Sequence, residues 1–309
     1  MMPGSFNAHP ANDARIINMK KTLLIFLAIV LLCCGGCSAL RVGYDHADLY
    51  LRYKIHGYTS FNSQQKDVIR REVAAYMYWH RKNVLPEYIA FLQDINGLVQ
   101  RNDRLKTEDV ARIRGEYNRL YRKTLDPAIR PTARMLSTID SRQIEYLVKA
   151  LTKKMRTQRE EKLFGSDQKN LVMRAERNID FVEKLVGNLS GKQKDKIIEL
   201  SLHMPYAAKY YIEFREANQD KLIALINSKA GEDKIAAFLT SWINTPEETR
   251  TPQQQQAIQS YENTMDEITV RIYELLTDRQ KIKLRKEILS YIEDFQHLNT
   301  EKITAIAVP

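Results

Sequence analysis

The chain has 309 residues and a formal net charge of +10. Its 11 Gly and 9 Pro are only 20 of 309 residues, against roughly 12% in average usage, which argues against a turn-rich β fold and favours long helices. All three cysteines lie between positions 33 and 37, so a disulfide framework spread over the fold is excluded.

A short apolar run stands near the N-terminus. Residues 23–32 are uncharged and apolar, and Met19-Lys20-Lys21 comes shortly before them. A basic segment followed by about 7–15 apolar residues is typical of a secretory signal peptide, whereas a helix that spans a membrane needs ~20. We therefore predict a signal peptide over residues 1–36, with translation starting at Met19.

The predicted signal peptide ends in Cys34-Gly35-Gly36-Cys37, which resembles the lipobox of bacterial lipoproteins. The resemblance implies a diacylglyceryl group on Cys37, and two or three acyl chains hold a protein stably on a membrane. Ser38 after the lipidated residue implies the periplasmic face of the outer membrane rather than the inner membrane. An ordinary cleaved signal peptide is the alternative. The C-x-x-C spacing also occurs in redox proteins, but there it accompanies a βαβ pattern that this sequence does not have.

Apolar residues recur with helical spacing from residue 61 onward. Between Ile258 and Leu275 they alternate in steps of three and four, a seam that we expect to pack within the chain. We predict an all-α fold, an extended multi-helix bundle of antiparallel helices with a short N-terminal tether. Its parts are a lipidated tether over 37–60, a single helical domain over 61–298 and a C-terminal tail over 299–309. The longest predicted loop spans 245–256.

Four predicted helices begin in the same way. An apolar residue is followed by a capping residue, which is Asn62, Asp140, Ser190 or Thr277, and a Gln stands three positions later. This pattern is the capping box, in which the capping side chain and the Gln each accept a hydrogen bond from the other's backbone amide. The spacing is irregular for a repeat array, although pairing 62 with 190 and 140 with 277 is compatible with an internal duplication.

Positive charge is concentrated between residues 101 and 162. This segment has 17 Lys and Arg against 9 Asp and Glu, a net charge of +8, while the rest of the chain after residue 36 is neutral. We expect a basic helical face that binds acidic envelope proteins or anionic lipid headgroups. Solvated helix faces without a partner are the alternative, and nucleic acid is disfavoured because the signal peptide takes the chain out of the cytoplasm. The candidate binding residues are Arg112, Arg114, Arg119, Arg122, Lys149, Lys153, Lys154 and Arg156.

Sequence patterns of catalysis or metal binding are not evident. The chain has no nucleophile elbow, phosphate loop or dinucleotide fingerprint. His46 stands beside Asp45 and Asp48, but the spacing matches no defined metal site. We expect no cofactor, no bound metal and no enzymatic activity. The alternative is an envelope hydrolase that acts on peptidoglycan or lipid and is centred near His80 and Glu87.

The N-terminal third carries a set of aromatic and glycine motifs. They are Gly43-Tyr44, Tyr53, Gly57-Tyr58, Gln65, Trp79-His80-Arg81 and Leu85-Pro86-Glu87-Tyr88. In these motifs the chain resembles an uncharacterised family of Gram-negative lipoproteins, defined as a domain of unknown function. The resemblance implies a lipid anchor and a helical fold, and no activity. Trp79, His80, Arg81, Glu87 and Tyr88 would line a corner between two helices, with Pro86 in the first turn of the second. This corner is a candidate ligand or partner site.

A second resemblance lies in Leu276-Thr277-Asp278-Arg279-Gln280, which reproduces the L-T-x-x-Q motif of the small periplasmic chaperones typified by Spy and CpxP. The segment 189–193 comes close to the same motif. The resemblance implies a helical protein whose basic concave surface holds unfolded clients. We therefore expect a membrane-anchored periplasmic lipoprotein, a non-enzymatic binding or chaperone-like envelope protein that acts through its basic helical face.

Overall fold

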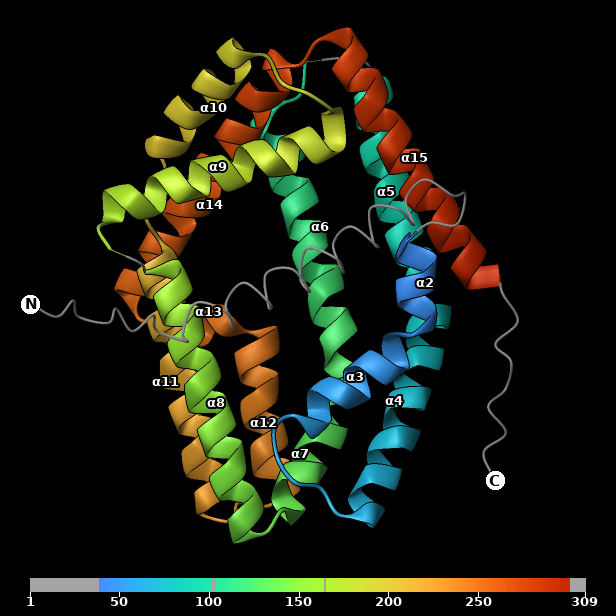
Figure 1. Ribbon diagram of the computed structural model, residues 1–309, viewed down its shortest axis with the longest axis vertical. Helices are drawn as coiled ribbons and strands as arrows, with labels where there is room; N and C mark the ends of the chain where they lie inside the picture. The colour runs from blue at the N-terminus through green and yellow to red at the C-terminus, as the bar shows by residue number, and fades with distance from the viewer. Residues whose placement is uncertain (1–38, 102–103, 164, 301–309) are drawn as a thin grey trace, which may run out of the picture. The chain divides into compact units, whose positions relative to one another are not determined.

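The computed structural model describes residues 39–101, 104–163 and 165–300 (Figure 1). All regular elements within these residues are helical, so the fold is an all-α multi-helix bundle, as predicted. The predicted signal peptide, the predicted lipid attachment at Cys37 and residues 301–309 of the predicted tail lie outside the described residues. The chain divides into two compact units, one ending at Ala47 and the other beginning at Asp48.

Short loops connect most of the helices. The first part of the chain forms α2 (Ala39–Asp45), α3 (Ala47–His56), α4 (Ser63–Asn83), α5 (Leu85–Gln100), α6 (Thr107–Leu125), the 3₁₀ helix η1 (Asp126–Ala128), α7 (Ile129–Thr138) and α8 (Ser141–Lys162). The second part forms α9 (Asp167–Val186), α10 (Gly191–Leu202), α11 (Ala208–Asn227), α12 (Glu232–Asn244), α13 (Pro246–Thr249), α14 (Pro252–Leu275) and α15 (Asp278–Thr300).

The four predicted capping boxes start helices α4, α8, α10 and α15. At Asn62, Asp140 and Ser190 the capping side chain accepts from the backbone amide of the Gln, and the Gln side chain accepts from the capping amide. Thr277 makes the same exchange with Gln280, at 3.3 and 2.9 Å. Each box satisfies backbone donors that a helix start leaves without partners, which fixes where these helices begin.

A fifth capping box lies in the segment that was predicted as the longest loop. Thr251 caps α14, Gln254 completes the box and Pro252 occupies the first turn. Residues 246–249 form the short helix α13. The predicted loop over 245–256 is therefore mostly helical.

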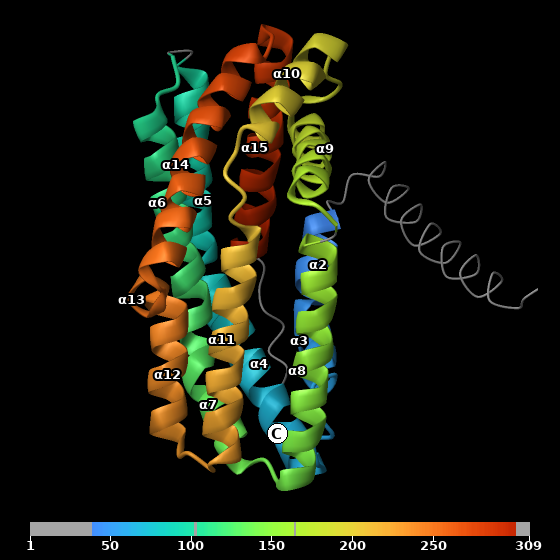
Figure 2. The same ribbon diagram turned by 90° about the vertical axis from the view of Figure 1, so that its left-hand side faces the viewer.

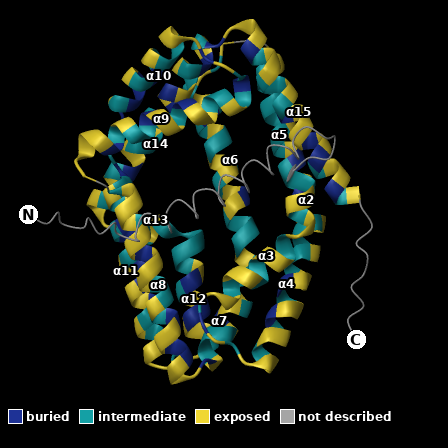
Figure 3. Cartoon of the chain, viewed as in Figure 1, coloured by how far each residue is buried: buried dark blue, intermediate teal, exposed yellow. Residues whose placement is uncertain are grey.

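Helices also lie upstream of residue 61, where the apolar pattern predicts the helical domain to begin. α2 and α3 occupy most of the segment 37–60 that was predicted as a tether. α3 has no buried residue, and Figure 3 shows it half-buried and exposed along its length. Because its apolar residues fall on both faces, it lacks the single apolar stripe by which the other helices are recognised. At the other end, α15 continues to Thr300, two residues into the predicted tail.

Buried apolar side chains form several clusters. The largest joins α7, α8, α11 and α12 and includes Ile144, Leu147, Ile226 and Ile235. A second joins α9, α10 and α14, a third packs α5 against α15, and a fourth packs α10 against α14. The seam predicted on α14 contributes the buried Ile268 to the fourth, so it packs within the chain as predicted. Each fully buried side chain of this kind stabilises the fold by roughly 1.5–3 kcal/mol.

Candidate functional site

The predicted basic residue at the centre of α6 is held in a buried ion pair. The Arg114 guanidinium donates to both carboxylate oxygens of Asp266 at 2.8–3.2 Å and to Glu262 at 2.9 Å. The Asp266 side chain is 3% exposed. The hydrogen bonds between Arg114 and Asp266 raise the pKa of Arg114 above its ordinary value. Breaking a fully buried pair costs on the order of 3–5 kcal/mol. Because Arg114 is half-buried, we expect about 2–3 kcal/mol here, which still binds Arg114 to its own chain.

The other three predicted arginines of α6 are also ion-paired. Arg119 reaches Glu87 and Glu116, both at 2.7 Å. Arg112 pairs with Asp94 at 2.5 Å, and Arg122 pairs with Glu247 at 3.0 Å. These pairs are partly exposed and individually worth ~0–1 kcal/mol. Together they pair the α6 half of the predicted basic face with carboxylates of the same chain, and binding of acidic partners by these arginines stays a prediction.

The predicted basic residues on α8 are in a different environment. Lys149 and Arg156 are 77% and 70% exposed, and their partners Glu145 and Glu160 lie 3.9 Å away, one helical turn along α8. Exposed pairs of this kind contribute only ~0.3–0.5 kcal/mol, so a competing carboxylate can displace them at little cost. Lys153 is exposed and makes no ion pair with any described residue. Lys154 differs, because its ammonium donates to the Tyr58 hydroxyl at 2.5 Å and lies over that ring.

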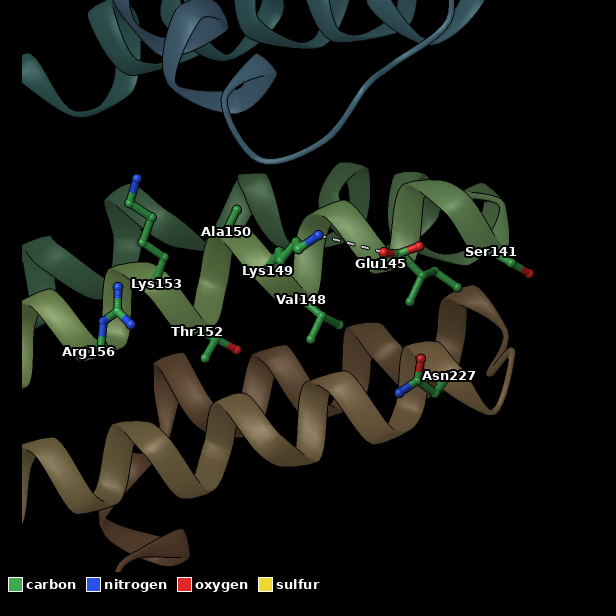
Figure 4. Close-up of a pocket in the computed structure, with 10 residues that line it drawn as sticks. Ser141, Glu145, Val148, Lys149, Ala150, Thr152, Lys153, Arg156 and Asn227 are labelled. Atoms are coloured by element: carbon green, nitrogen blue, oxygen red, sulfur yellow. Dashed lines mark ion pairs between the residues drawn. The ribbon is translucent and has the colours of Figure 1, made fainter.

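A groove of about 900 Å³ runs along α8. We call it the α8 groove. Nine of its ten lining residues come from α8 and the tenth is Asn227, at the C-terminus of α11. α8 and α11 lie alongside each other (Figures 1 and 2), and the ion pair between Arg159 and Glu216 joins them at 2.7 Å. In Figure 4, Val148 and Thr152 point toward α11, whereas Lys153 points to the opposite side of α8.

The lining of the α8 groove combines apolar and basic groups. Ile144, Val148 and Ala150 supply the apolar part, and Lys149, Lys153 and Arg156 supply the cations. Ile144 belongs to the largest buried cluster and Val148 packs against it, so the core beneath holds this part of the lining. A groove of this composition suits a segment that carries both apolar and acidic side chains.

The predicted basic face is therefore divided between two environments. The α6 arginines pack against carboxylates of α5, α13 and α14, and three of the four predicted cations on α8 line the α8 groove. Sequence reasoning found those three cations from charge density. It missed Val148 and Thr152, although the spacing from Ile144 to Val148 is one helical turn, and it could not have found Asn227, which approaches from another helix.

The predicted corner lies between α4 and α5, with Pro86 in the first turn of α5 as expected. His80 stands between the rings of Tyr76 and Tyr88, each with its centroid 6.0 Å away. Burial lowers the pKa of His80 to about 4 and raises the pKa of Tyr76 to about 12. The hydroxyls of both tyrosines bond to Thr124, Tyr76 at 3.0 Å to the carbonyl and Tyr88 at 2.8 Å to the hydroxyl.

The remaining corner residues bind other parts of the chain. Arg81 donates to the carbonyl of Leu298 at 2.9 Å. The Glu87 carboxylate accepts from Lys123 and from Arg119, whose hydrogen bonds hold its pKa below the ordinary value. The Trp79 ring lies 6.0 Å from that of Tyr76. The corner is an aromatic and ionic junction that joins α4 and α5 to α6 and α15. Hydrolysis centred on His80 and Glu87 stays an untested alternative to the predicted lack of enzymatic activity.

The described residues show neither a metal site nor a helix that could span a membrane. No group of three or more His, Cys, Asp or Glu side chains that could hold a metal ion occurs within residues 39–101, 104–163 and 165–300. Over those ranges, no helix combines the length and apolar character that crossing a bilayer requires. Lipid attachment at Cys37 lies outside them and stays a prediction.

Comparison with known proteins identifies a family. The model of a family of unknown function, DUF6279, matches residues 57–248. No curated protein and no solved structure matches the chain. The matched segment covers more than half of the chain and contains both the corner and the α8 groove. It confirms the resemblance to an uncharacterised family, whereas the likeness to Spy and CpxP stays a prediction.

Proposed function

The chain belongs to the family of unknown function DUF6279, and from that premise we propose that it is a lipid-anchored, non-enzymatic binding protein of the bacterial envelope. Its anchor is the acylated Cys37, its location is the periplasmic face of the outer membrane, and its binding site is the α8 groove. The partners are envelope proteins that offer an acidic, amphipathic segment.

The observation that carries this proposal is the contrast between the two sets of cations. The α6 arginines are paired at 2.5–3.0 Å with carboxylates, and the pair of Arg114 is largely buried, whereas the ion-pair partners of Lys149 and Arg156 lie 3.9 Å away. A partner carboxylate would have to displace Asp266 from Arg114, at a cost of about 2–3 kcal/mol. At α8 it would displace at most an exposed pair worth less than ~1 kcal/mol. Lys149, Lys153 and Arg156 are therefore the cations that an acidic partner can engage at low cost.

The apolar lining decides what kind of acidic partner fits. Charge alone would attract any anion, and such attraction is screened over ~8–10 Å at physiological salt. The half-buried Val148 and Ala150, above the buried Ile144, add a surface that releases water when an apolar side chain covers it. A segment with acidic residues on one side and apolar residues on the other uses both features, which also fits the capture of unfolded chains by a chaperone-like protein.

The test is a binding measurement on the lipidated full-length protein in detergent micelles. The probe is a fluorescent synthetic helix with Glu on one face and Leu on the other, followed by anisotropy at increasing salt. We expect binding that weakens with salt, and the triple variant Lys149→Glu, Lys153→Glu, Arg156→Glu should bind at least tenfold more weakly.

A matched control separates the α8 groove from net charge. Lys192, Lys234 and Lys286 are exposed lysines on α10, α12 and α15. Changing these three to Glu alters the net charge by the same amount and should leave binding within about twofold of the wild type. Equal losses in the two triple variants would show general charge attraction and overturn the assignment to α8.

A further inference from the structure

Helix α3 presents large apolar side chains to solvent. Leu49, Tyr50 and Tyr53 are 55%, 59% and 73% exposed. The opposite face, with Leu51 and Ile55, is half-buried. A surface helix ordinarily places charged and polar residues on its outer side. On α3 the outer side is at least as apolar as the inner side.

This helix has little to stabilise it in water. It is ten residues long and has no buried residue. Helices shorter than ~12–15 residues are marginal in water without packing. An ion pair one turn apart, Arg52 to Asp48 at 2.9 Å, adds only ~0.3–0.5 kcal/mol. A surface that covers Leu49, Tyr50 and Tyr53 would supply the missing burial.

The chemistry of the outer side matches the boundary between lipid and water. Tyrosine has an apolar ring and a polar hydroxyl, and it is enriched at the level of lipid headgroups. The Lys54 ammonium lies 5.1 Å from the centre of the Tyr50 ring. In that position the lysine can keep its charge at the anionic headgroups while its stem covers apolar surface.

The proposed anchor places this helix close to a bilayer. Leu49 follows Cys37 by 12 positions, which span at most ~40 Å when fully extended. The span is shorter in this chain because residues 39–45 are helical. A tether of this length keeps α3 at a high effective concentration next to the headgroups.

Resting on the proposed lipid anchor, we infer that α3 lies on the surface of the membrane that holds the anchor. Leu49, Tyr50 and Tyr53 sit at the level of the headgroups, and Lys54 pairs with anionic lipid. The anchor and α3 then attach the protein at two points, which restricts how the helical bundle can turn relative to the bilayer.

The test places a single spin label on the lipidated full-length protein. After signal cleavage and acylation the mature chain has no other thiol, so Tyr53→Cys and Leu49→Cys each give one labelling site. Tyr78→Cys is the control, since Tyr78 is 56% exposed on α4. The protein is reconstituted in vesicles of phosphatidylethanolamine and phosphatidylglycerol, and label collisions with dissolved oxygen and with a water-soluble nickel complex are compared.

We expect the labels at 53 and 49 to favour oxygen and the label at 78 to favour nickel. Flotation of the vesicles is scored first. Protein that does not float overturns the anchor and this inference together. Protein that floats while labels 53 and 49 behave like label 78 overturns the inference alone.

Discussion

Gln65 and Gln143, 78 positions apart, exchange two side-chain hydrogen bonds, at 2.6 and 3.2 Å. Each is the Gln of a capping box, at the start of α4 and of α8. Gln143 also donates to the carbonyl of Ser60 at 2.8 Å and is buried. Two helix starts are thus fastened to each other through the residues that cap them. We call this contact the first clasp.

A second clasp joins the starts of α10 and α15. Gln193 and Gln280 exchange hydrogen bonds at 2.8 and 3.2 Å. Gln280 donates to the carbonyl of Asn188 at 3.0 Å. Asn188 stands two positions before the cap Ser190, as Ser60 stands two positions before the cap Asn62. Gln280 therefore contacts the box at 190 in the way that Gln143 contacts the box at 62. The boxes correspond as 62 with 190 and 140 with 277, which is the pairing that the sequence indicates for an internal duplication.

The first prediction concerns the energy of the first clasp. Gln143→Ala removes the side chain that accepts from the Asp140 amide, and it also leaves the Ser60 carbonyl and the Gln65 side-chain amide without this partner. We therefore expect a loss of about 2–3 kcal/mol in the free energy of unfolding. Gln254→Ala is the control, because the Gln254 side chain completes its own box and makes no hydrogen bond to another helix within the described residues. It should lose ~1 kcal/mol or less. Urea denaturation measures both, and equal losses would contradict a role for the contact between the boxes.

The clasps show where prediction from the sequence ends. Each capping box was predictable because its residues lie within four positions. Thr251 with Gln254 has the same spacing of cap and Gln in the segment that was predicted as a loop, but Arg250 stands where the other four boxes have an apolar residue. The exchange between Gln65 and Gln143 was not predictable, because it depends on how distant helices pack. The same holds at α6, where the charge of Arg114 is evident but its partner Asp266 lies 152 positions away. On α8 the ion-pair partners are one turn away, so the sequence could indicate which cations stay exposed.

A second prediction concerns the turn after α9. Gly187 has φ 82° and ψ −165°, a region that is essentially restricted to glycine. A Cβ there would also lie 3.1 Å from Nζ of Lys283. We expect Gly187→Ala to destabilise the fold by about 1–3 kcal/mol. Gly191→Ala is the opposite case, because Gly191 is helical with open space around it; it should stabilise by ~0.4–1 kcal/mol. Thermal unfolding of the two variants should shift in opposite directions.

A third prediction concerns the ion pair between α6 and α14. Asp266→Ala leaves the half-buried Arg114 with Glu262 as its only remaining acidic partner in the pair, and we expect a loss of about 2–3 kcal/mol. Glu274→Ala removes the partner of Arg104, whose side chain is 83% exposed, and should change stability by less than ~1 kcal/mol. Denaturant midpoints compare the two. If the variants lost equal stability, burial would not be what makes the Asp266 pair strong.

The fourth prediction follows from His80. Burial lowers its pKa from 6.5 to about 4, so between these pH values the unfolded chain holds a proton on this ring that the folded chain does not. The contribution of the unprotonated His80 to the free energy of unfolding is therefore fully present above about pH 6.5, and it is lost as the pH drops toward 4. A difference of this size corresponds to roughly 3 kcal/mol at 1.36 kcal/mol per pH unit. Because the ring is only half-buried, we expect ~1–2 kcal/mol.

The measurement is urea denaturation at pH 7 and at pH 4.5. Carboxylates elsewhere also titrate over this range, so the readout is the difference between the wild type and variants that cannot take up a proton at position 80. His80→Phe keeps an aromatic ring beside Tyr76 and Tyr88, and His80→Gln keeps a polar group. Both should lose less stability than the wild type between the two pH values, by ~1–2 kcal/mol. If the wild type and both variants lost the same amount, His80 would not oppose protonation in the folded chain.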